Sequence, residues 1–437
     1  MISPTILAPR LADHLPRQRW FGAKDRAIEF VRIIDGEVLV EGWPALYRVE
    51  AEVALGDDTA RYQLMLGLRP TGQTCEFLTG HEAAVLGEFE TDRGQALVYD
   101  GLLDPELAVG LLSVVVPHLQ AEHVRPVGAE QSNTSLVYDD AVILKVFRRL
   151  ADGPNPEVEV TEALAEVGFT SVAEPLGAWR HENRDLAFAQ RFLAGGTEGW
   201  AMALTSLREL YADPTDPAEA GGDFGAEAHR IGEVTADLHI AMAKAFGRAP
   251  GNADEWADLM DEQLKRVLTG EMAEGARRLV SRLRELDDAG PAIRVHGDFH
   301  LGQVMRTDPG WYVLDFEGEP ARPLAERVRA TSPLKDVAGM LRSFGYAPAV
   351  AMATQDEDVT ALARAWEARN RACFLDGYLT RADDAAILPE DPAARSAVLA
   401  AFELDKAIYE VAYEQSHRPE WVEIPTRAVA QLVEAGR

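Results

Sequence analysis

The chain has 437 residues, too many for one compact core, so two or three domains are expected. It carries 72 Asp and Glu against 43 Lys and Arg, a formal net charge of −29 that disfavours binding to nucleic acid or to an anionic membrane. Two cysteines are too few for a disulfide framework or a cysteine-based zinc site. No apolar leader is seen, and no apolar stretch approaches the ~20 residues of a membrane span, so we expect a cytoplasmic protein. We also expect a monomer.

Residues 1–90 are expected to form a β-rich cap domain. Apolar and polar residues alternate along Ile28–Val40, Leu46–Leu55 and Arg61–Leu68, which is the pattern of half-buried strands. A short helix carrying Pro16–Trp20 is expected before them. The segment offers no grouping of catalytic side chains, so the chemistry is expected further along the chain.

Residues 91–197 are expected to hold an intermediate region and a second β-rich lobe. Asp139 and Asp140 are a favourable hairpin-turn pair, and Pro156 with acidic residues after it favours the start of a helix. The expected elements are a helix at Pro105–Leu119, strands at Thr134–Tyr138 and Ala141–Phe147, a helix from about Asn155, and a strand at Leu186–Leu193.

Residues 198–437 are expected to form a mainly helical lobe. Apolar residues recur at helical spacing from Ile231 to Met242, and a short β segment at Ile293–Val295 and Trp311–Phe316 interrupts the helices. A β-rich lobe followed by a helical lobe is the order found in kinase-like proteins. We therefore predict an α+β, bilobal protein-kinase-like fold with a β-rich N-terminal cap and a mainly helical C-lobe.

The segment His296–Gln303, with the sequence HGDFHLGQ, carries the strongest chemical signal. It lies between the two short strands, and Asp315 ends the second strand. The arrangement resembles the catalytic loop H-G-D-x-H-x-x-N and the metal-binding Asp of the aminoglycoside- and choline-kinase branch of kinase-like enzymes. In phosphoryl transfer an Asp accepts the proton of the attacking hydroxyl, and a second Asp with an amide oxygen holds Mg²⁺.

Asp298 fits the role of catalytic base, and Asp315 with Gln303 fits the metal site. Gln303 departs from the Asn of the resembled motif but offers the same carbonyl on a longer arm. His300 is expected either to contact substrate or phosphate or to have a structural role. His296 is expected to brace the backbone of the loop.

Lys145 lies inside an apolar strand, where an ammonium without a partner is costly. In kinase-like enzymes a strand Lys binds the α- and β-phosphates of ATP and pairs with a Glu of the next helix. Glu157, Glu159 and Glu162 are available, and we favour Glu159. The alternative is a solvent-facing Lys on an edge strand.

Two further segments are candidates for nucleotide binding. Ser132, Asn133, Thr134 and Ser135 precede the Lys145 strand and could donate hydrogen bonds to phosphate through hydroxyl, amide and backbone groups. The alternative for them is a plain turn. Gln190 and Phe192 lie at the end of the last strand of this lobe, where a kinase hinge would bind adenine; the alternative is a strand without a ligand.

Several longer runs resemble the actinobacterial maltokinases over nearly the whole chain. These runs are Arg17–Phe21, Glu130–Ser135, Asp315–Pro320 and Ser332–Phe344. The resemblance implies a kinase that uses ATP and Mg²⁺ to phosphorylate maltose at its anomeric hydroxyl. The product, maltose 1-phosphate, would feed α-glucan and glycogen synthesis.

The C-terminal part of the chain is expected to supply the sugar site. Polar groups beside aromatic rings suit a sugar, whose hydroxyls need hydrogen bonds and whose C–H faces pack on rings. Without the resemblance, the tyrosines here could equally be core residues of an amphipathic helix. The expected sugar contacts are Asp298, His300, Glu317, Lys406, Glu410, Tyr413 and Trp421.

Three questions stay open at this point. A kinase of the same architecture could act on glucosamine or another sugar, and the chain could be a silent pseudokinase, although Lys145, Asp298, Gln303 and Asp315 are chemically competent. The cap could stiffen the following lobe, control its opening, or dock a maltose-producing enzyme.

Overall fold

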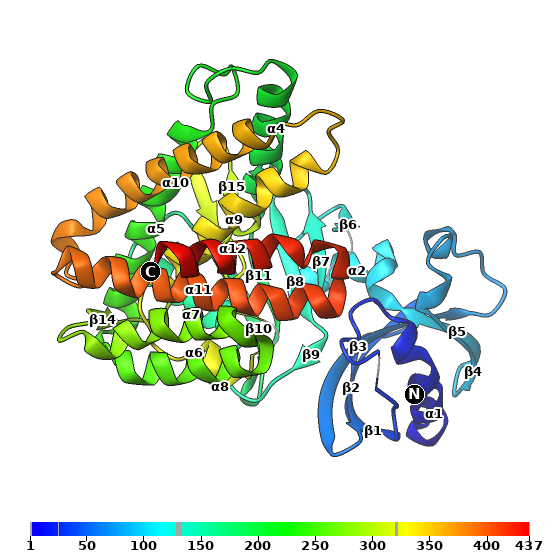
Figure 1. The fold of residues 1–437 in the computed structure, drawn as a ribbon. Helices are drawn as coiled ribbons and strands as arrows, with labels where there is room; N and C mark the ends of the chain where they lie inside the picture. Colours follow the sequence, from blue (N-terminus) through cyan, green and yellow to red (C-terminus); the bar gives the residue numbers. More distant parts are fainter. Residues whose placement is uncertain (1, 25, 128–132, 320–321, 437) are drawn as a thin grey trace. The chain divides into compact units, whose positions relative to one another are not determined.

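The computed structural model describes residues 2–24, 26–127, 133–319 and 322–436. These residues fall into two compact units, one made of Met1–Glu159 and Ala173–Ala194 and the other of Val160–Val172 and Gly195–Arg437. Strands dominate the first unit and helices dominate the second (Figure 1). The predicted α+β class, with a β-rich N-terminal part and a helical C-terminal part, is confirmed.

The first sheet of the N-terminal unit has the strand order β1-β2-β3-β5-β4, and β9 pairs with β3. The three strands predicted here are confirmed as β1, β2 and β3. The strands are β1 (Phe30–Val40), β2 (Ala45–Leu55), β3 (Asp58–Pro70), β4 (Val85–Thr91), β5 (Gly94–Asp100) and β9 (Arg149–Leu150).

Helix α1 (Pro4–His14) buries Leu7 and Leu11 in the same core as β2 and β3. The expected helix at Pro16–Trp20 is wrong, because α1 ends at His14 and a 3₁₀ turn follows at Leu15–Arg17. Pro16 has no N–H group and cannot continue the hydrogen-bond ladder of an α-helix.

The second sheet has the order β10-β11-β8-β7-β6, and helix α2 (Pro105–Val115) packs in the same core. Asp139 and Asp140, between β7 and β8, have φ values of 48° and 50°, as a type I′ hairpin turn requires. The strands are β6 (Val124–Pro126), β7 (Asn133–Tyr138), β8 (Val142–Phe147), β10 (Pro175–His181) and β11 (Arg184–Arg191).

The predicted end of the cap at residue 90 lies inside β4, and β4 pairs with β5 in the same sheet. Strand β9 follows β8 directly and pairs with β3, so the two sheets of this unit are joined by main-chain hydrogen bonds. The division into residues 1–90, 91–197 and 198–437 stays a prediction.

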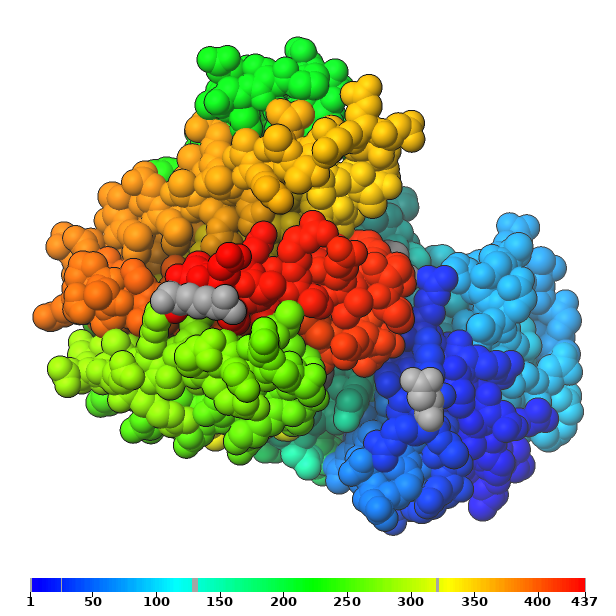
Figure 2. Space-filling view, viewed as in Figure 1, coloured from blue at the N-terminus to red at the C-terminus, as the bar shows by residue number. Residues whose placement is uncertain are grey.

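The second unit is a helical body around one large core. Helices α11 and α12 run across its face beside α6 and α7, as the red and green surfaces of Figure 2 show. The helices are α4 (Gly199–Ala212), α5 (Gly225–Phe246), α6 (Ala253–Val267), α7 (Gly270–Ser281), α8 (Leu324–Arg327), α9 (Leu334–Met352), α10 (Thr360–Ala382), α11 (Pro392–His417) and α12 (Glu423–Ala435).

A small sheet in this unit has the order β12-β15-β16, with β12 (Thr197–Glu198), β15 (Val304–Arg306) and β16 (Trp311–Val313). The strand expected at Ile293–Val295 is reduced to a single bridge between Ile293 and Thr331 that follows β14 (Pro291–Ala292). Within the described ranges, no helix is long and apolar enough to span a lipid bilayer.

Candidate active site

The backbone of the His296–Gln303 loop is anchored by Asp336, in the first turn of α9. Its carboxylate accepts hydrogen bonds from the N–H groups of His296 at 2.7 Å and Gly297 at 2.8 Å, and contacts His239 Nε2 at 3.1 Å. Burial opposes ionisation of Asp336, but these partners outweigh it and lower the pKa of the carboxyl. Asp336 lies in the Ser332–Phe344 run, but its local sequence gives no sign of this role.

His296 braces the loop from the inside, as expected. Its Nδ1 accepts a hydrogen bond from the N–H of Asp298 at 3.3 Å, and its Nε2 lies 2.7 Å from the carbonyl of Leu314. This pattern requires the neutral Nε2–H tautomer. The ring also lies between Phe299 and Phe316, with centroids 5.3 and 5.0 Å away.

Asp298 presents its carboxylate from this braced loop and is 22% exposed. Its Oδ1 accepts a hydrogen bond from Lys406 Nζ at 3.0 Å, and Oδ2 has no hydrogen bond to any residue that the structure describes. Burial opposes ionisation, but the charge of Lys406 outweighs it, so the pKa of Asp298 is lowered. The group is therefore an ionised carboxylate with one oxygen available to a ligand.

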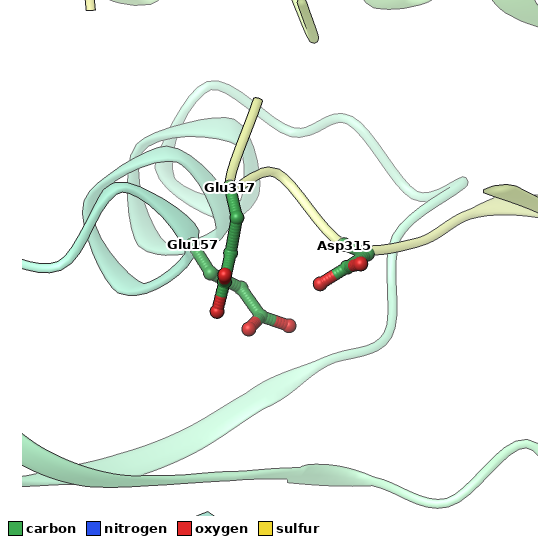
Figure 3. A group of neighbouring side chains, drawn as sticks. All are labelled: Glu157, Asp315 and Glu317. Atoms are coloured by element: carbon green, nitrogen blue, oxygen red, sulfur yellow. The ribbon is translucent and has the colours of Figure 1, made fainter. Parts of the chain in front are cut away.

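Asp315 follows β16 with a φ of 61°, a conformation in which a side chain costs energy but which Asp tolerates. Gln303 Nε2 donates to Asp315 Oδ2 at 3.4 Å. Glu317 lies on the same loop, and carboxylate oxygens of Asp315 and Glu317 lie within 4.8 Å of one another (Figure 3). Two carboxylates and an amide carbonyl are the ligands that Mg²⁺ prefers, so these residues fit the metal.

His300 accepts a hydrogen bond at Nδ1 from the N–H of Gly302 at 3.0 Å, at the start of a short 3₁₀ turn. Burial lowers the pKa of His300, which keeps its ring neutral. This geometry gives the ring a structural role. The expected contact with substrate stays a prediction.

Lys145 lies on β8, a central strand flanked by β7 and β11, so the edge-strand alternative is excluded. Its Nζ is 2.5 Å from Glu157 Oε1, and Glu157 projects from the first turn of α3 (Pro156–Glu166; Figure 3). The preference for Glu159 was therefore wrong. Glu157 is 2% exposed and Glu159 is half-buried, since the phase of the helix, which the sequence leaves open, turns Glu157 toward the strand.

Phosphate binding by the segment before β8 stays a prediction. Thr134 Oγ1 accepts a hydrogen bond from the buried Arg148 at 2.9 Å, and Arg148 also pairs with Asp100 at 2.5 Å. Ser135 is buried, and its Oγ has no hydrogen-bond partner in the described part of the chain. Asn133 begins β7, and Ser132 lies outside the described residues.

The segment expected to bind adenine ends strand β11. Gln190 is buried and pairs in register with Ile143, while the N–H of Phe192 donates to the carbonyl of Ala141 at 2.8 Å. The Phe192 amide is thus already used within the lobe. Adenine binding by this segment stays a prediction.

Helix α11 carries Lys406 and Glu410 one turn apart. Lys406 Nζ contacts Glu319 Oε1 at 2.8 Å as well as Asp298, and lies 4.8 Å from the centre of the Tyr409 ring. Glu410 accepts from Arg342 Nε at 2.9 Å. Burial raises the pKa of Glu410 despite the charge of Arg342. Further hydrogen bonds to the Glu410 carboxylate would therefore stabilise its ionised form.

Tyr413 and Trp421 lie further along the same end of the chain. Tyr413 is 38% exposed and stacks on His417 at 4.3 Å, so it is a surface residue and not a core aromatic. The guanidinium of Arg418 lies 4.4 Å from the centre of the Trp421 ring, and Arg418 also pairs with Glu414 at 2.7 Å. Tyr413 is therefore partly exposed, and Trp421 lies beside a charged group.

The ionised Asp298 on a braced loop, the carboxylates after β16 and the Lys145–Glu157 pair define an enzyme of the phosphotransferase class. Residues 123–375 match the model of the phosphotransferase enzyme family, and residues 14–104 match that of the maltokinase N-terminal cap domain. The chain belongs to this phosphotransferase family and carries the maltokinase-type cap.

Several known proteins are similar to this chain over most of its length. A glucosamine kinase of Streptacidiphilus jiangxiensis is 31% identical over 333 residues, covering 71% of this chain and 73% of that protein. A glucosamine kinase of Mycolicibacterium smegmatis is 28% identical over 329 residues, covering 71% and 80%. A solved glucosamine kinase in complex with glucosamine, ADP and inorganic phosphate has a TM-score of 0.65 at 24% identity, covering 92% of this chain and 93% of that one. This last likeness shows the fold.

Proposed function

We propose that this protein transfers the γ-phosphate of ATP to the anomeric hydroxyl of maltose, giving maltose 1-phosphate and ADP. The product would feed α-glucan and glycogen synthesis. The observation that carries the choice of a neutral sugar is the position of Lys406, whose ammonium lies 3.0 Å from the catalytic carboxylate of Asp298.

Asp298 is the base in this proposal. Its unoccupied Oδ2 accepts the proton of the anomeric hydroxyl while the hydroxyl oxygen bonds to the γ-phosphorus and the bond to the bridging oxygen of ADP breaks. The lowered pKa keeps Asp298 ionised at neutral pH.

Two further groups bind the phosphates. Lys145, held by Glu157, supplies a cation for the α- and β-phosphates. Asp315, Gln303 and Glu317 would hold Mg²⁺, which supplies charge neutralisation for the phosphoryl oxygens.

Lys406 favours a neutral acceptor for an electrostatic reason. An amino sugar carries an ammonium group, and a second cation close to Lys406 would be repelled. A neutral sugar instead offers oxygen atoms that can accept hydrogen bonds from Lys406. Asp298 Oδ2 and Glu410 Oε1 are two acceptors near it that have no hydrogen bond to the described residues.

Aromatic side chains beyond Lys406 suit a second sugar ring. Tyr409 and Tyr413 stack with centroids 6.4 Å apart, and Trp421 lies at the end of the same segment. Sugar C–H faces pack well on such rings. Tyr413 and Trp421 are thus proposed contacts of the second glucose unit of maltose.

Glucosamine is the alternative acceptor. It is supported by the names of the two relatives that are 31% and 28% identical. The negative net charge of −29 would also attract a cationic sugar over a distance. The local charge of Lys406 weighs against it.

The test is an assay that couples ADP release to NADH oxidation, run with maltose, glucose, maltotriose and glucosamine at equal concentration. We expect the highest kcat/KM with maltose and a phosphate ester at the anomeric carbon by ³¹P NMR. Turnover of glucosamine alone would reject maltose while leaving the phosphotransferase class intact. No turnover of any sugar would reject sugar phosphorylation.

A further inference from the structure

Charged side chains of alternating sign form a row behind the catalytic carboxylate. From Asp298, the row passes to Lys406 at 3.0 Å and on to Glu319 at 2.8 Å. The second oxygen of Glu319 accepts a hydrogen bond from Arg322, and Arg322 lies 3.7 Å from Asp405. All five residues belong to the second unit, and Asp298 is the member that the proposed reaction uses directly.

Both carboxylate oxygens of Glu319 are used within this row. It is 2% exposed, and each of its carboxylate oxygens is engaged by a cation, one by Lys406 and the other by Arg322. Glu319 is therefore a fixed counter-charge for Lys406 and is not placed to ligate a metal or a sugar.

Arg322 is itself held in place by contacts with residues other than Glu319. Its Nη2 donates to Gln263 Oε1 at 3.3 Å, and Gln263 donates to both the carbonyl and the carboxylate of Asp405 at 2.8 Å. Its guanidinium also lies 5.9 Å from the centre of the Tyr409 ring. A planar guanidinium held at several points in this way has little freedom to move.

Lys406 is shared between two carboxylates, and Arg322 decides how strongly one of them attracts it. While Arg322 neutralises part of the charge of Glu319, Lys406 remains on Asp298 as well. Without Arg322, Glu319 would be a buried carboxylate whose remaining hydrogen-bonded cation is Lys406, with the charge of Lys335 also acting on it. The ammonium would then be drawn toward Glu319 and away from Asp298.

We propose that Arg322 is a positioning residue that, through Glu319, holds Lys406 on Asp298 and so excludes amino sugars from the acceptor site. This inference rests on the proposed sugar phosphorylation with Asp298 as the base. Arg322 reaches neither Asp298 nor the sugar. It sets the local charge that the 2-substituent of the sugar meets.

The test compares the binding of glucose and glucosamine, which differ in a hydroxyl or an ammonium at one carbon. Calorimetry on the full chain measures both dissociation constants in the wild type and in Arg322→Gln. In Arg322→Gln we expect the dissociation constant of glucosamine, divided by that of glucose, to fall about tenfold. This corresponds to about 1.4 kcal/mol in favour of glucosamine. Arg322→Lys, which keeps the charge beside Glu319, should restore most of the wild-type ratio.

Arg329→Gln is the matched control, because it removes the same charge from a nearby position. Arg329 is 50% exposed and pairs with Glu255 at the surface. The ratio in Arg329→Gln should equal that of the wild type. If Arg322→Gln slows maltose turnover but leaves the ratio unchanged, Arg322 is merely structural and the inference is wrong. Because binding is measured without turnover, absence of maltose kinase activity in the wild type would reject the proposed function separately.

Discussion

The ammonium of Lys406 lies 3.0 Å from Oδ1 of Asp298, so the proposed base forms an ion pair with a residue 108 positions further along the chain. Burial opposes the charge on Lys406, but Asp298 and Glu319 outweigh it and raise its pKa well above the ordinary value. The pair therefore stays charged across the neutral pH range. It links the His296–Gln303 loop to α11, the helix that carries the proposed sugar contacts Lys406, Glu410 and Tyr413.

Replacing the base should abolish most of the activity and spare nucleotide binding. Asp298→Asn cannot accept the proton of the hydroxyl, and we expect kcat with maltose to fall by about 10²–10⁴-fold. ATP affinity, measured by calorimetry, should change little. Asp308→Asn, an exposed residue between β15 and β16, is the control and should keep wild-type kcat. An active Asp298→Asn would remove Asp298 from the mechanism.

The Lys145–Glu157 pair can be tested against the acid that sequence reasoning favoured. Glu157→Gln leaves the ammonium of Lys145 without the carboxylate 2.5 Å away, so it should raise the KM for ATP about tenfold, equivalent to about 1.4 kcal/mol. Glu159→Gln, on the same helix, should change this KM much less. Initial rates at varied ATP and saturating maltose measure both. Equal effects of the two substitutions would contradict the assigned pairing.

Asp336 should stabilise the fold in a pH-dependent way. Its folded pKa is lowered from an ordinary value of 3.8, so its contribution is fully present above pH 3.8 and is lost as pH falls through the folded pKa. Asp336→Asn replaces a buried, charged acceptor of three hydrogen bonds and should cost about 2–4 kcal/mol at pH 7. Urea denaturation at pH 7 and pH 3 measures the difference between variant and wild type.

That difference should shrink as pH is lowered from 3.8 through the folded pKa, because the carboxyl is then protonated first in the unfolded chain and finally in the folded protein. Asp308→Asn provides the reference for a carboxylate without buried partners. A difference that is constant with pH would show that the charge of Asp336 is unimportant. The kcat of Asp336→Asn should also fall, since its partners are the N–H groups of the loop that presents Asp298.

Helix α9 approaches the His296–Gln303 loop closely at Gly339. A Cβ atom there would lie 2.5 Å from the carbonyl oxygen of Phe299, a backbone atom next to Asp298. Gly339→Ala should therefore lower the melting temperature, at a cost of about 1–3 kcal/mol, and reduce kcat. Gly310→Ala, where the added Cβ meets nothing within 4 Å, is the control and should be nearly neutral. Thermal unfolding of both variants checks this, and an unaffected Gly339→Ala would mean that the loop can move away.

Local chemistry made much of the fold predictable. Alternating runs specified β1, β2 and β3, and the Asp139–Asp140 pair specified the β7–β8 hairpin because short polar side chains tolerate positive φ. The helix ending at His14 was misplaced, and the strands β4 and β5 were not identified. Their short runs carry a weak alternating pattern. The strand conformation of β5 is instead stabilised by its pairing with β3, which the local sequence does not show.

The sequence by itself determined the reaction chemistry of this protein: the spacing of Asp298, Gln303 and Asp315 and the lone Lys145 in an apolar strand are local patterns tied to phosphoryl transfer. Only the tertiary structure decided which partner each charge has. The pairing of Lys145 with Glu157 depends on helix phase, and the row from Asp298 through Lys406 to Arg322 joins three distant segments. Coulombic and hydrogen-bond energies depend on distance in space, which spacing along a chain does not give.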